Sequence, residues 1–138
     1  MPNKKILIVE DDPDVLLGMR IRLEANHYET FFAGDVESTV PAAQKHTPDL
    51  ILLDLGLPGG GGFKAMENVK ADPALAAIPI IIVSGRTGQE TRAQALKGGA
   101  KAFLEKPVDN QELLAVIRQA LGPNETTHPK PGASEVPR

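Results

Sequence analysis

Short apolar runs recur along the chain, and each is followed by a segment with the spacing of an amphipathic helix. The runs occupy residues 6–9, 28–32, 50–53, 80–83 and 102–104. Three of them, "ILIV", "LILL" and "IIIV", are continuous rather than alternating, which is typical of strands buried on both faces of a parallel sheet. Strands and helices that alternate in this way predict an α/β fold in which helices connect parallel strands.

The segments between the runs carry the start and stop signals of helices. Helices are expected over residues 13–25, 63–70, 89–97 and 110–121. Asp12 and Asp109 stand where N-caps are expected. Residues 35–45 are less regular, because Pro41 would remove a helical hydrogen bond, and we expect a kink or a helix start near Ser38.

Length and composition favour one domain. The chain has 138 residues, of which 41% are hydrophobic, and this suits a single domain with its own core. We expect that domain to span residues 1–122. Residues 123–138 hold four of the twelve prolines and almost nothing apolar, so burial cannot offset the entropy of ordering them. They are predicted to be a disordered C-terminal tail or a truncated linker.

Charge and cysteine content narrow the function classes. The net charge of −3 argues against direct binding to nucleic acid or to an anionic membrane. Cysteine is absent, which excludes disulfides and thiolate metal sites. The N-terminal "MPNKKILIVEDD" has too short an apolar run for a signal peptide or a membrane span. We therefore expect a cytoplasmic protein.

Polar residues follow four of the five apolar runs directly or within two residues. They are Glu10, Asp11 and Asp12 after the first run, Asp54 after the third, Ser84 after the fourth, and Lys106 shortly after the fifth. Each alone is readily explained as a cap, a turn residue or a solvated charge. In an open α/β sheet, however, ligands bind beyond the carboxyl ends of the strands, so these groups are expected to meet at one edge.

Together these residues predict phosphoryl chemistry. Clustered carboxylates repel one another unless a cation is present, and Mg²⁺ prefers carboxylates, water and phosphate oxygens. Lys106 would add a positive charge for a phosphoryl group, and Ser84 would donate a hydrogen bond to one of its oxygens. Asp54 could itself be the nucleophile, which would give an aspartyl phosphate.

Four separated motifs identify a family that the chain resembles. They are "ILIVEDDPDV", "PDLILLDLGLPG", "IPIIIVSGR" and "GGAKAFLEKPVD", and they stand in the order and at the spacing found in receiver domains of two-component response regulators. The resemblance covers residues 4–121. It implies a flavodoxin-like (βα)5 fold with a five-stranded parallel sheet of order 2-1-3-4-5.

The resemblance also implies residue roles. Asp54 would accept a phosphoryl group from a phosphohistidine on a sensor histidine kinase or a histidine phosphotransfer protein. Asp11, Asp54 and the backbone carbonyl of Gly56 would bind Mg²⁺ directly, with Glu10 acting through water. Lys106 would bind the phosphoryl group, and its peptide bond to Pro107 is expected to be cis.

Ser84 and Phe103 match the family's switch pair. The hydroxyl group would move toward the phosphoryl group and the aromatic ring would turn inward, which would change a surface for a downstream protein effector. That surface would comprise the fourth predicted helix, the fifth strand and the fifth helix. The resemblance also allows a phosphorylation-dependent homodimer. Plain core packing remains an alternative role for Phe103.

Three rival functions stay open at this point. A haloacid-dehalogenase-like phosphatase would carry its nucleophile in "DDPDV", after the first strand. A flavodoxin-like nucleotide or flavin carrier would need a loop that binds phosphate at this position, whereas the loop of this chain is acidic. A receiver fold that no longer accepts phosphate is the third. The glycines at 59–62 lack the Lys-Ser or Lys-Thr of a phosphate-binding loop and are expected to form a flexible loop that leaves Asp54 open.

Overall fold

The structure of the protein is a computed structural model, and it describes residues 3–59, 61–85 and 89–122. Strands and helices alternate through these residues. In chain order they are β1 (Lys5–Val9), α1 (Pro13–Ala25), β2 (Glu29–Ala33), α2 (Val36–His46), β3 (Leu50–Asp54), α3 (Gly61–Ala71), β4 (Ile80–Ser84), α4 (Gln89–Lys97), β5 (Ala102–Glu105) and α5 (Asn110–Leu121). Each strand lies within one residue of its predicted bounds. The predicted tail, 123–138, lies outside the described residues.

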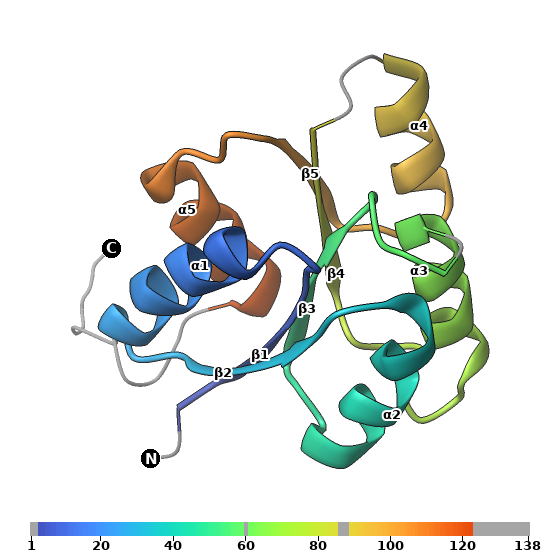
Figure 1. Cartoon of the computed structure of the whole chain (residues 1–138), viewed down its shortest axis with the longest axis horizontal. Coiled ribbons are helices and arrows are strands. Elements are labelled where there is room, and N and C mark those ends of the chain that lie inside the picture. The colour runs from blue at the N-terminus through green and yellow to red at the C-terminus, as the bar shows by residue number, and fades with distance from the viewer. Residues whose placement is uncertain (1–2, 60, 86–88, 123–138) are drawn as a thin grey trace.

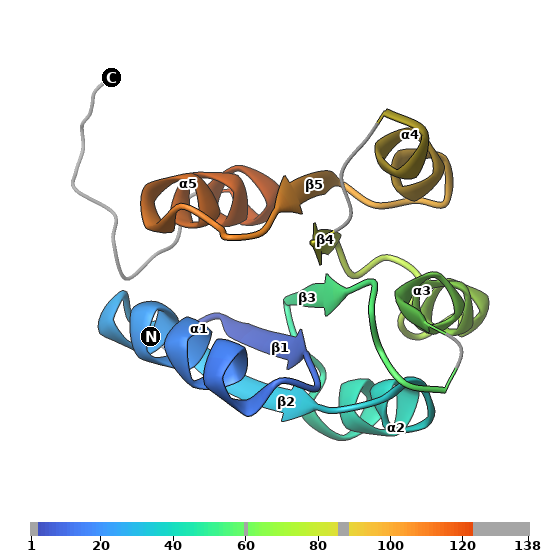
Figure 2. The ribbon, with the colours of Figure 1, turned by 45° about the horizontal axis from the view of Figure 1, so that its top comes forward.

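The strands form one parallel sheet in the order β2-β1-β3-β4-β5. This confirms the predicted fold and strand order. Helices α1 and α5 cover one face of the sheet, and α2, α3 and α4 cover the other (Figures 1 and 2). Because α1 and α2 leave the sheet toward opposite faces, the carboxyl ends of β1 and β3 mark the point where the strand order reverses.

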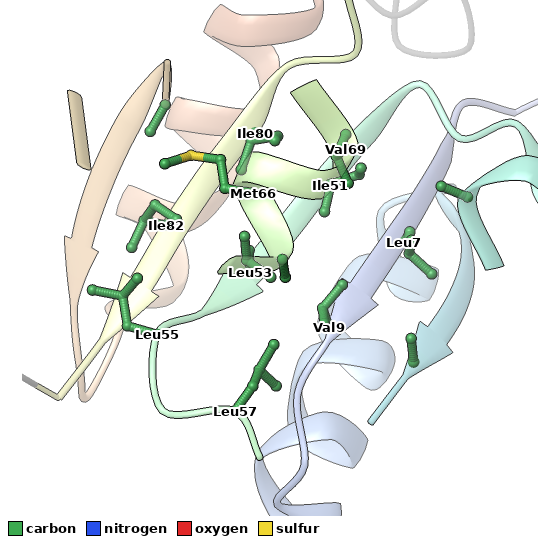
Figure 3. Close-up of a cluster of buried hydrophobic side chains, with 14 of the residues drawn as sticks. Leu7, Val9, Ile51, Leu53, Leu55, Leu57, Met66, Val69, Ile80 and Ile82 are labelled. Carbon is green, nitrogen blue, oxygen red and sulfur yellow. The ribbon is translucent and has the colours of Figure 1, made fainter. Parts of the chain in front are cut away.

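The central strands are buried on both faces, as their continuous apolar runs predict. Side chains from β1, β3 and β4 alternate between two apolar clusters, one under each layer of helices. Figure 3 shows the cluster under α2, α3 and α4, where Leu7, Ile51 and Ile80 lie beside Met66 and Val69 of α3. Packing on both faces fixes the position of each strand along its own axis. It therefore also fixes the positions of the residues at the carboxyl end of the strand.

Helices α1 and α5 begin after the N-cap residues that the sequence predicts. The carboxylate of Asp12 accepts hydrogen bonds from the backbone N–H groups of Asp14 (2.8 Å) and Val15 (3.3 Å), and Pro13 occupies the first helical position of α1. Asp109 caps α5 by accepting from the N–H of Glu112 at 3.0 Å. Among the helices of the described residues, none is long and apolar enough to cross a membrane.

Of the two alternatives expected for α2, a kink or a start near Ser38, the second is wrong. The helix begins at Val36 rather than near Ser38, and it continues across Pro41. Asp35 explains the early start, because its carboxylate accepts from both the N–H (2.8 Å) and the hydroxyl group (2.6 Å) of Ser38. Pro41 removes only the hydrogen bond to the carbonyl of Glu37, and both residues are exposed, so water can satisfy that carbonyl.

The prediction for the glycine run was wrong for two of its four residues. Gly61 and Gly62 belong to α3, which therefore begins two residues before the expected start at residue 63. The N–H of Gly62 donates to the carbonyl of Leu55 at 2.9 Å. A Cβ at position 62 would lie 2.4 Å from the backbone oxygen of Asp54. Glycine at this position thus permits close packing of α3 against the end of β3, rather than a flexible loop.

Candidate functional site

The carboxyl ends of β1, β3, β4 and β5 bring the predicted polar residues to one edge of the sheet. Asp54 and Ser84 are the last residues of β3 and β4, Glu10 follows β1, and Lys106 follows β5. The backbone N–H of Lys106 donates to the carbonyl of Ser84 at 2.8 Å, and its peptide bond to Pro107 is cis, as expected. The site therefore draws on segments from near both ends of the described chain.

Lys106 joins two of the acids. Its Nζ lies 3.0 Å from Oε1 of Glu10 and 3.3 Å from Oδ1 of Asp54. The Lys106 side chain is one-quarter exposed, whereas the Asp54 side chain is nearly buried. Burial alone would lower the pKa of Lys106, but its hydrogen bond with Glu10 and the charge of Asp54 outweigh that effect and raise the pKa. The ammonium group thus stays charged between two acids.

Glu10 is the most buried acid of the site, at 3% exposure. Burial raises the pKa of its carboxyl group, and the hydrogen bond from Asp12 and the bond to Lys106 oppose that rise. The Asp12 N–H donates to Oε2 of Glu10 at 3.2 Å, while Lys106 binds Oε1. Both carboxylate oxygens of Glu10 therefore have partners within the site.

Three carboxylates form a cluster that suits a divalent cation. Oxygen atoms of Glu10, Asp11 and Asp54 lie within 4.8 Å of one another, and Asp11 alone of the three is exposed. One lysine beside three acids leaves an excess of negative charge. Carboxylate oxygens are the ligands that Mg²⁺ takes, and the exposed Asp11 leaves room for the waters that this ion retains. The donor set and its charge fit Mg²⁺.

Gly56 lies two residues beyond Asp54, in the turn after β3. A Cβ at position 56 would stand 3.5 Å from Oδ2 of Asp54, which is ordinary van der Waals contact. Any larger side chain at this position would therefore lie against the Asp54 carboxylate. Glycine leaves that side of the carboxylate open.

Ser84 and Phe103 lie on neighbouring strands in diagonal positions. Ser84 pairs with Glu105, and Phe103 precedes Glu105 by two residues, so alternation along the strands puts Ser84 and Phe103 on the same face of the sheet. Ser84 is 1% exposed and Phe103 is 4% exposed. The ring of Phe103 belongs to the apolar cluster under α2, α3 and α4, so it already faces inward.

Arg92 is a contact that the sequence did not predict. Its guanidinium carbon lies 5.0 Å from the centroid of the Phe103 ring. The two residues are eleven positions apart and belong to different elements, α4 and β5. Only the packing of α4 against β5 brings them together, so no local sequence pattern could have indicated the pair.

Comparisons with known proteins agree with this geometry. The family model described as "Response regulator receiver domain" matches residues 6–118. The chain is 32% identical over 117 residues to Protein PilH of Pseudomonas aeruginosa, covering 85% of this chain and 97% of PilH. It is 35% identical over 116 residues to Response regulator PleD of Caulobacter vibrioides, covering 84% of this chain but only 26% of PleD.

A solved structure extends the comparison to three dimensions. The receiver domain of the sensor histidine kinase PA1611 from Pseudomonas aeruginosa was determined with a magnesium ion coordinated in its active site cleft. It aligns with a TM-score of 0.80 and 28% sequence identity, over 87% of this chain and 98% of that one. The likeness thus covers most of this chain and nearly all of that one.

Proposed function

Because the chain belongs to the response regulator receiver domain family, we propose that Asp54 is the residue on which it accepts a phosphoryl group. A receiver domain is a signalling phosphoacceptor and not an enzyme with a separate substrate, and Mg²⁺ is its cofactor. The observation that carries the assignment is the position of Lys106, whose Nζ lies 3.3 Å from Oδ1 of Asp54. A carboxylate beside a fixed ammonium group, at the open end of a strand, is suited to attack phosphorus.

The proposed transfer conserves atoms and electrons. A carboxylate oxygen of Asp54 attacks the phosphorus of a phosphohistidine, the P–N bond breaks, and the imidazole leaves with its electron pair. Lys106 binds a phosphoryl oxygen and offsets its charge. Asp11, Asp54 and the carbonyl of Gly56 would hold Mg²⁺ directly, with Glu10 acting through water, and the bound ion supplies further positive charge to the phosphoryl oxygens.

We further propose how the signal leaves the site. The new phosphoryl oxygens attract the hydroxyl group of Ser84, and the ring of Phe103 moves further inward, into the space that the hydroxyl group vacates. Support comes from the diagonal placement of the two residues on one face of the sheet. The surface that changes comprises α4, β5 and α5.

Receiver domains act between histidine kinases and downstream effectors. For this chain we propose that a sensor histidine kinase or a histidine phosphotransfer protein is the donor, and that the output partner is a protein bound at α4, β5 and α5. A cytoplasmic location forms part of the proposal. A phosphorylation-dependent homodimer at the same surface is the alternative output, and size-exclusion chromatography with and without phosphodonor distinguishes the two.

Intact-mass spectrometry tests the assignment of Asp54. The protein is incubated with acetyl phosphate, with and without Mg²⁺, as wild type, Asp54→Asn and Asp12→Asn. We expect a gain of one phosphoryl group, about 80 Da, in the wild type and Asp12→Asn with Mg²⁺, and none in Asp54→Asn. A gain in Asp54→Asn would move the nucleophile to the acids after β1. No gain in any protein would indicate a receiver fold that does not accept phosphate.

A further inference from the structure

We propose that Arg92 is a positioning residue, which holds the ring of Phe103 in its buried orientation and thereby limits how far the ring moves when Asp54 is phosphorylated. The proposal rests on the switch role given to Phe103 above. It adds a residue of α4 to that switch and ties the position of this helix to the position of the ring.

The contact between Arg92 and Phe103 is the first observation. The guanidinium carbon lies 5.0 Å from the ring centroid, within the range in which a cation over an aromatic face is attracted by the ring's quadrupole. Phe103 is 4% exposed, whereas Arg92 is exposed. The arginine therefore covers the outer side of a ring whose inner side packs in the core.

A groove beside the ring is the second observation. It has a volume of about 340 Å³ and is lined by Arg92, Phe103, Glu105, Lys106, Pro107 and Glu112. Phe103 and Arg92 both line this groove, and the guanidinium group lies over the ring. An outward turn of the ring would therefore disturb its contact with Arg92.

The attachment of α4 is the third observation. Ala95 is the one buried residue of this helix. Arg92 precedes Ala95 by three residues and so lies near the same side of the helix. With so small an apolar anchor, the pair of Arg92 with Phe103 adds to the attachment of α4 to β5. A shift of the ring therefore changes a contact that holds the helix as well.

A second pair in the same chain provides a matched control. Arg20 of α1 lies 5.7 Å from the centroid of the Phe32 ring, but Phe32 is 56% exposed. That ring has no buried orientation to keep, and its strand, β2, lies at the far edge of the sheet from β5. Equivalent substitutions there should leave Phe103 undisturbed.

A double-mutant cycle in the unphosphorylated protein tests the contact itself. Arg92→Gln removes the cation with similar length, and Phe103→Leu removes the ring while remaining apolar. We expect the two changes to be coupled by a factor of about two to five in the unfolding equilibrium, the range for a cation over an aromatic ring near the surface. Arg92→Lys should retain part of the coupling. A coupling factor of one would overturn the proposal.

NMR spectra of the protein with ¹³C-labelled phenylalanine test the orientation of the ring. We expect the Phe103 ring signals to shift in Arg92→Gln and to return toward the wild-type position when Mg²⁺ and beryllofluoride are added. The apparent affinity for beryllofluoride should fall about two- to fivefold, because a smaller fraction of the variant holds the ring inward. Arg20→Gln should change neither. Unchanged Phe103 signals in Arg92→Gln would overturn the proposal.

The two proposals fail in different ways. If acetyl phosphate adds no mass to the wild type, the proposed function fails, yet the coupling in the unphosphorylated protein still reports whether Arg92 holds the ring. If the wild type and Arg92→Gln both gain the phosphoryl mass but the cycle shows no coupling, only the role of Arg92 is wrong.

Discussion

Helices α3 and α4 cover the same face of the sheet but are attached to it in different ways. Four residues of α3 are buried, and its start contacts the backbone of β3 so closely that Gly62 has no room for a Cβ. In α4 the buried set is Ala95 alone. The difference places the firmly packed helix beside Asp54, the proposed phosphoacceptor, and the loosely packed helix on the surface proposed to change.

This difference suits a switch. A phosphoacceptor must keep its geometry to react, whereas an output surface must shift for little free energy. Elements with few buried apolar contacts open at the lowest cost, and α4 fits that description better than α3. Substitutions in these two regions should therefore differ in the size of their effect on stability.

The largest effect is expected from Gly62→Ala. The added methyl group would meet the backbone oxygen of Asp54 at 2.4 Å, and backbone cannot move aside cheaply. We expect a loss of about 3 kcal/mol in the free energy of unfolding, measured with denaturant. Gly98→Ala, just after α4, is the control, because its methyl group would meet the flexible end of the Met66 side chain and should cost less than about 1 kcal/mol. Equal losses would remove the contrast between the two helices.

The next largest effect on stability is expected from the charged residues around Asp54. Lys106→Met leaves Glu10 and Asp54 without their cation. We expect a loss of about 1–2 kcal/mol, less than for a fully buried pair because Lys106 is partly exposed. Saturating Mg²⁺ should stabilise this variant more than the wild type, since the ion then has no ammonium group to compete with. Thermal unfolding with and without Mg²⁺ measures both changes, and an equal Mg²⁺ effect in both proteins would contradict the shared site.

A smaller effect is expected from pH. Burial raises the pKa of Glu10 in the folded protein, so the folded state holds this proton over a range where the unfolded state has lost it. Its contribution is therefore most favourable near and below the ordinary value of 4.5 and declines as the pH rises through the raised pKa. In the absence of Mg²⁺, the free energy of unfolding of Glu10→Gln should therefore increase relative to that of the wild type as the pH rises through this range. A constant difference between the two proteins would mean that Glu10 titrates normally.

The smallest effect is expected in α1. Gly18 lies inside this helix, and a Cβ there would meet only the Arg22 guanidinium, at 3.9 Å. Gly18→Ala should raise the free energy of unfolding by about 0.5 kcal/mol, because alanine loses less backbone entropy in a helix. Gly62→Ala and Gly18→Ala are the same substitution in two helices, so opposite signs would show that packing, and not helix propensity, sets the cost at position 62.

The sequence was sufficient for the arrangement of the sheet and for the edge that carries the acids. Continuous apolar runs located the strands to within a residue, and the carboxyl-end rule placed Asp54 and Lys106 together. It was not sufficient for the start of α2, where the hydrogen bonds of Asp35 outweigh the cost of Pro41. The capping residue Asp35 and the helix-breaking residue Pro41 favour different starts for this helix. Which of them prevails depends on whether water can reach the carbonyl group that Pro41 leaves without a hydrogen bond.

The contacts that the sequence did not predict join different elements of the fold. Gly62 is glycine because of the backbone that passes beside it, and Arg92 covers Phe103 because α4 packs against β5. Likewise, nothing in the run of acids distinguishes the buried Glu10 from the exposed Asp11. Such features depend on tertiary packing, which periodicity and motif spacing do not describe.

The pair of Lys106 with Glu10 spans 96 residues, and this separation has a consequence for protein synthesis. On the ribosome, Asp54 emerges long before β5 does, so a nascent chain carries the proposed acceptor aspartate without Lys106. Its reactive edge is completed only when β5 pairs with β4. A chain released before β5 would lack the ammonium group that the proposed transfer uses, and on that proposal unfinished copies would compete poorly for the phosphoryl donor.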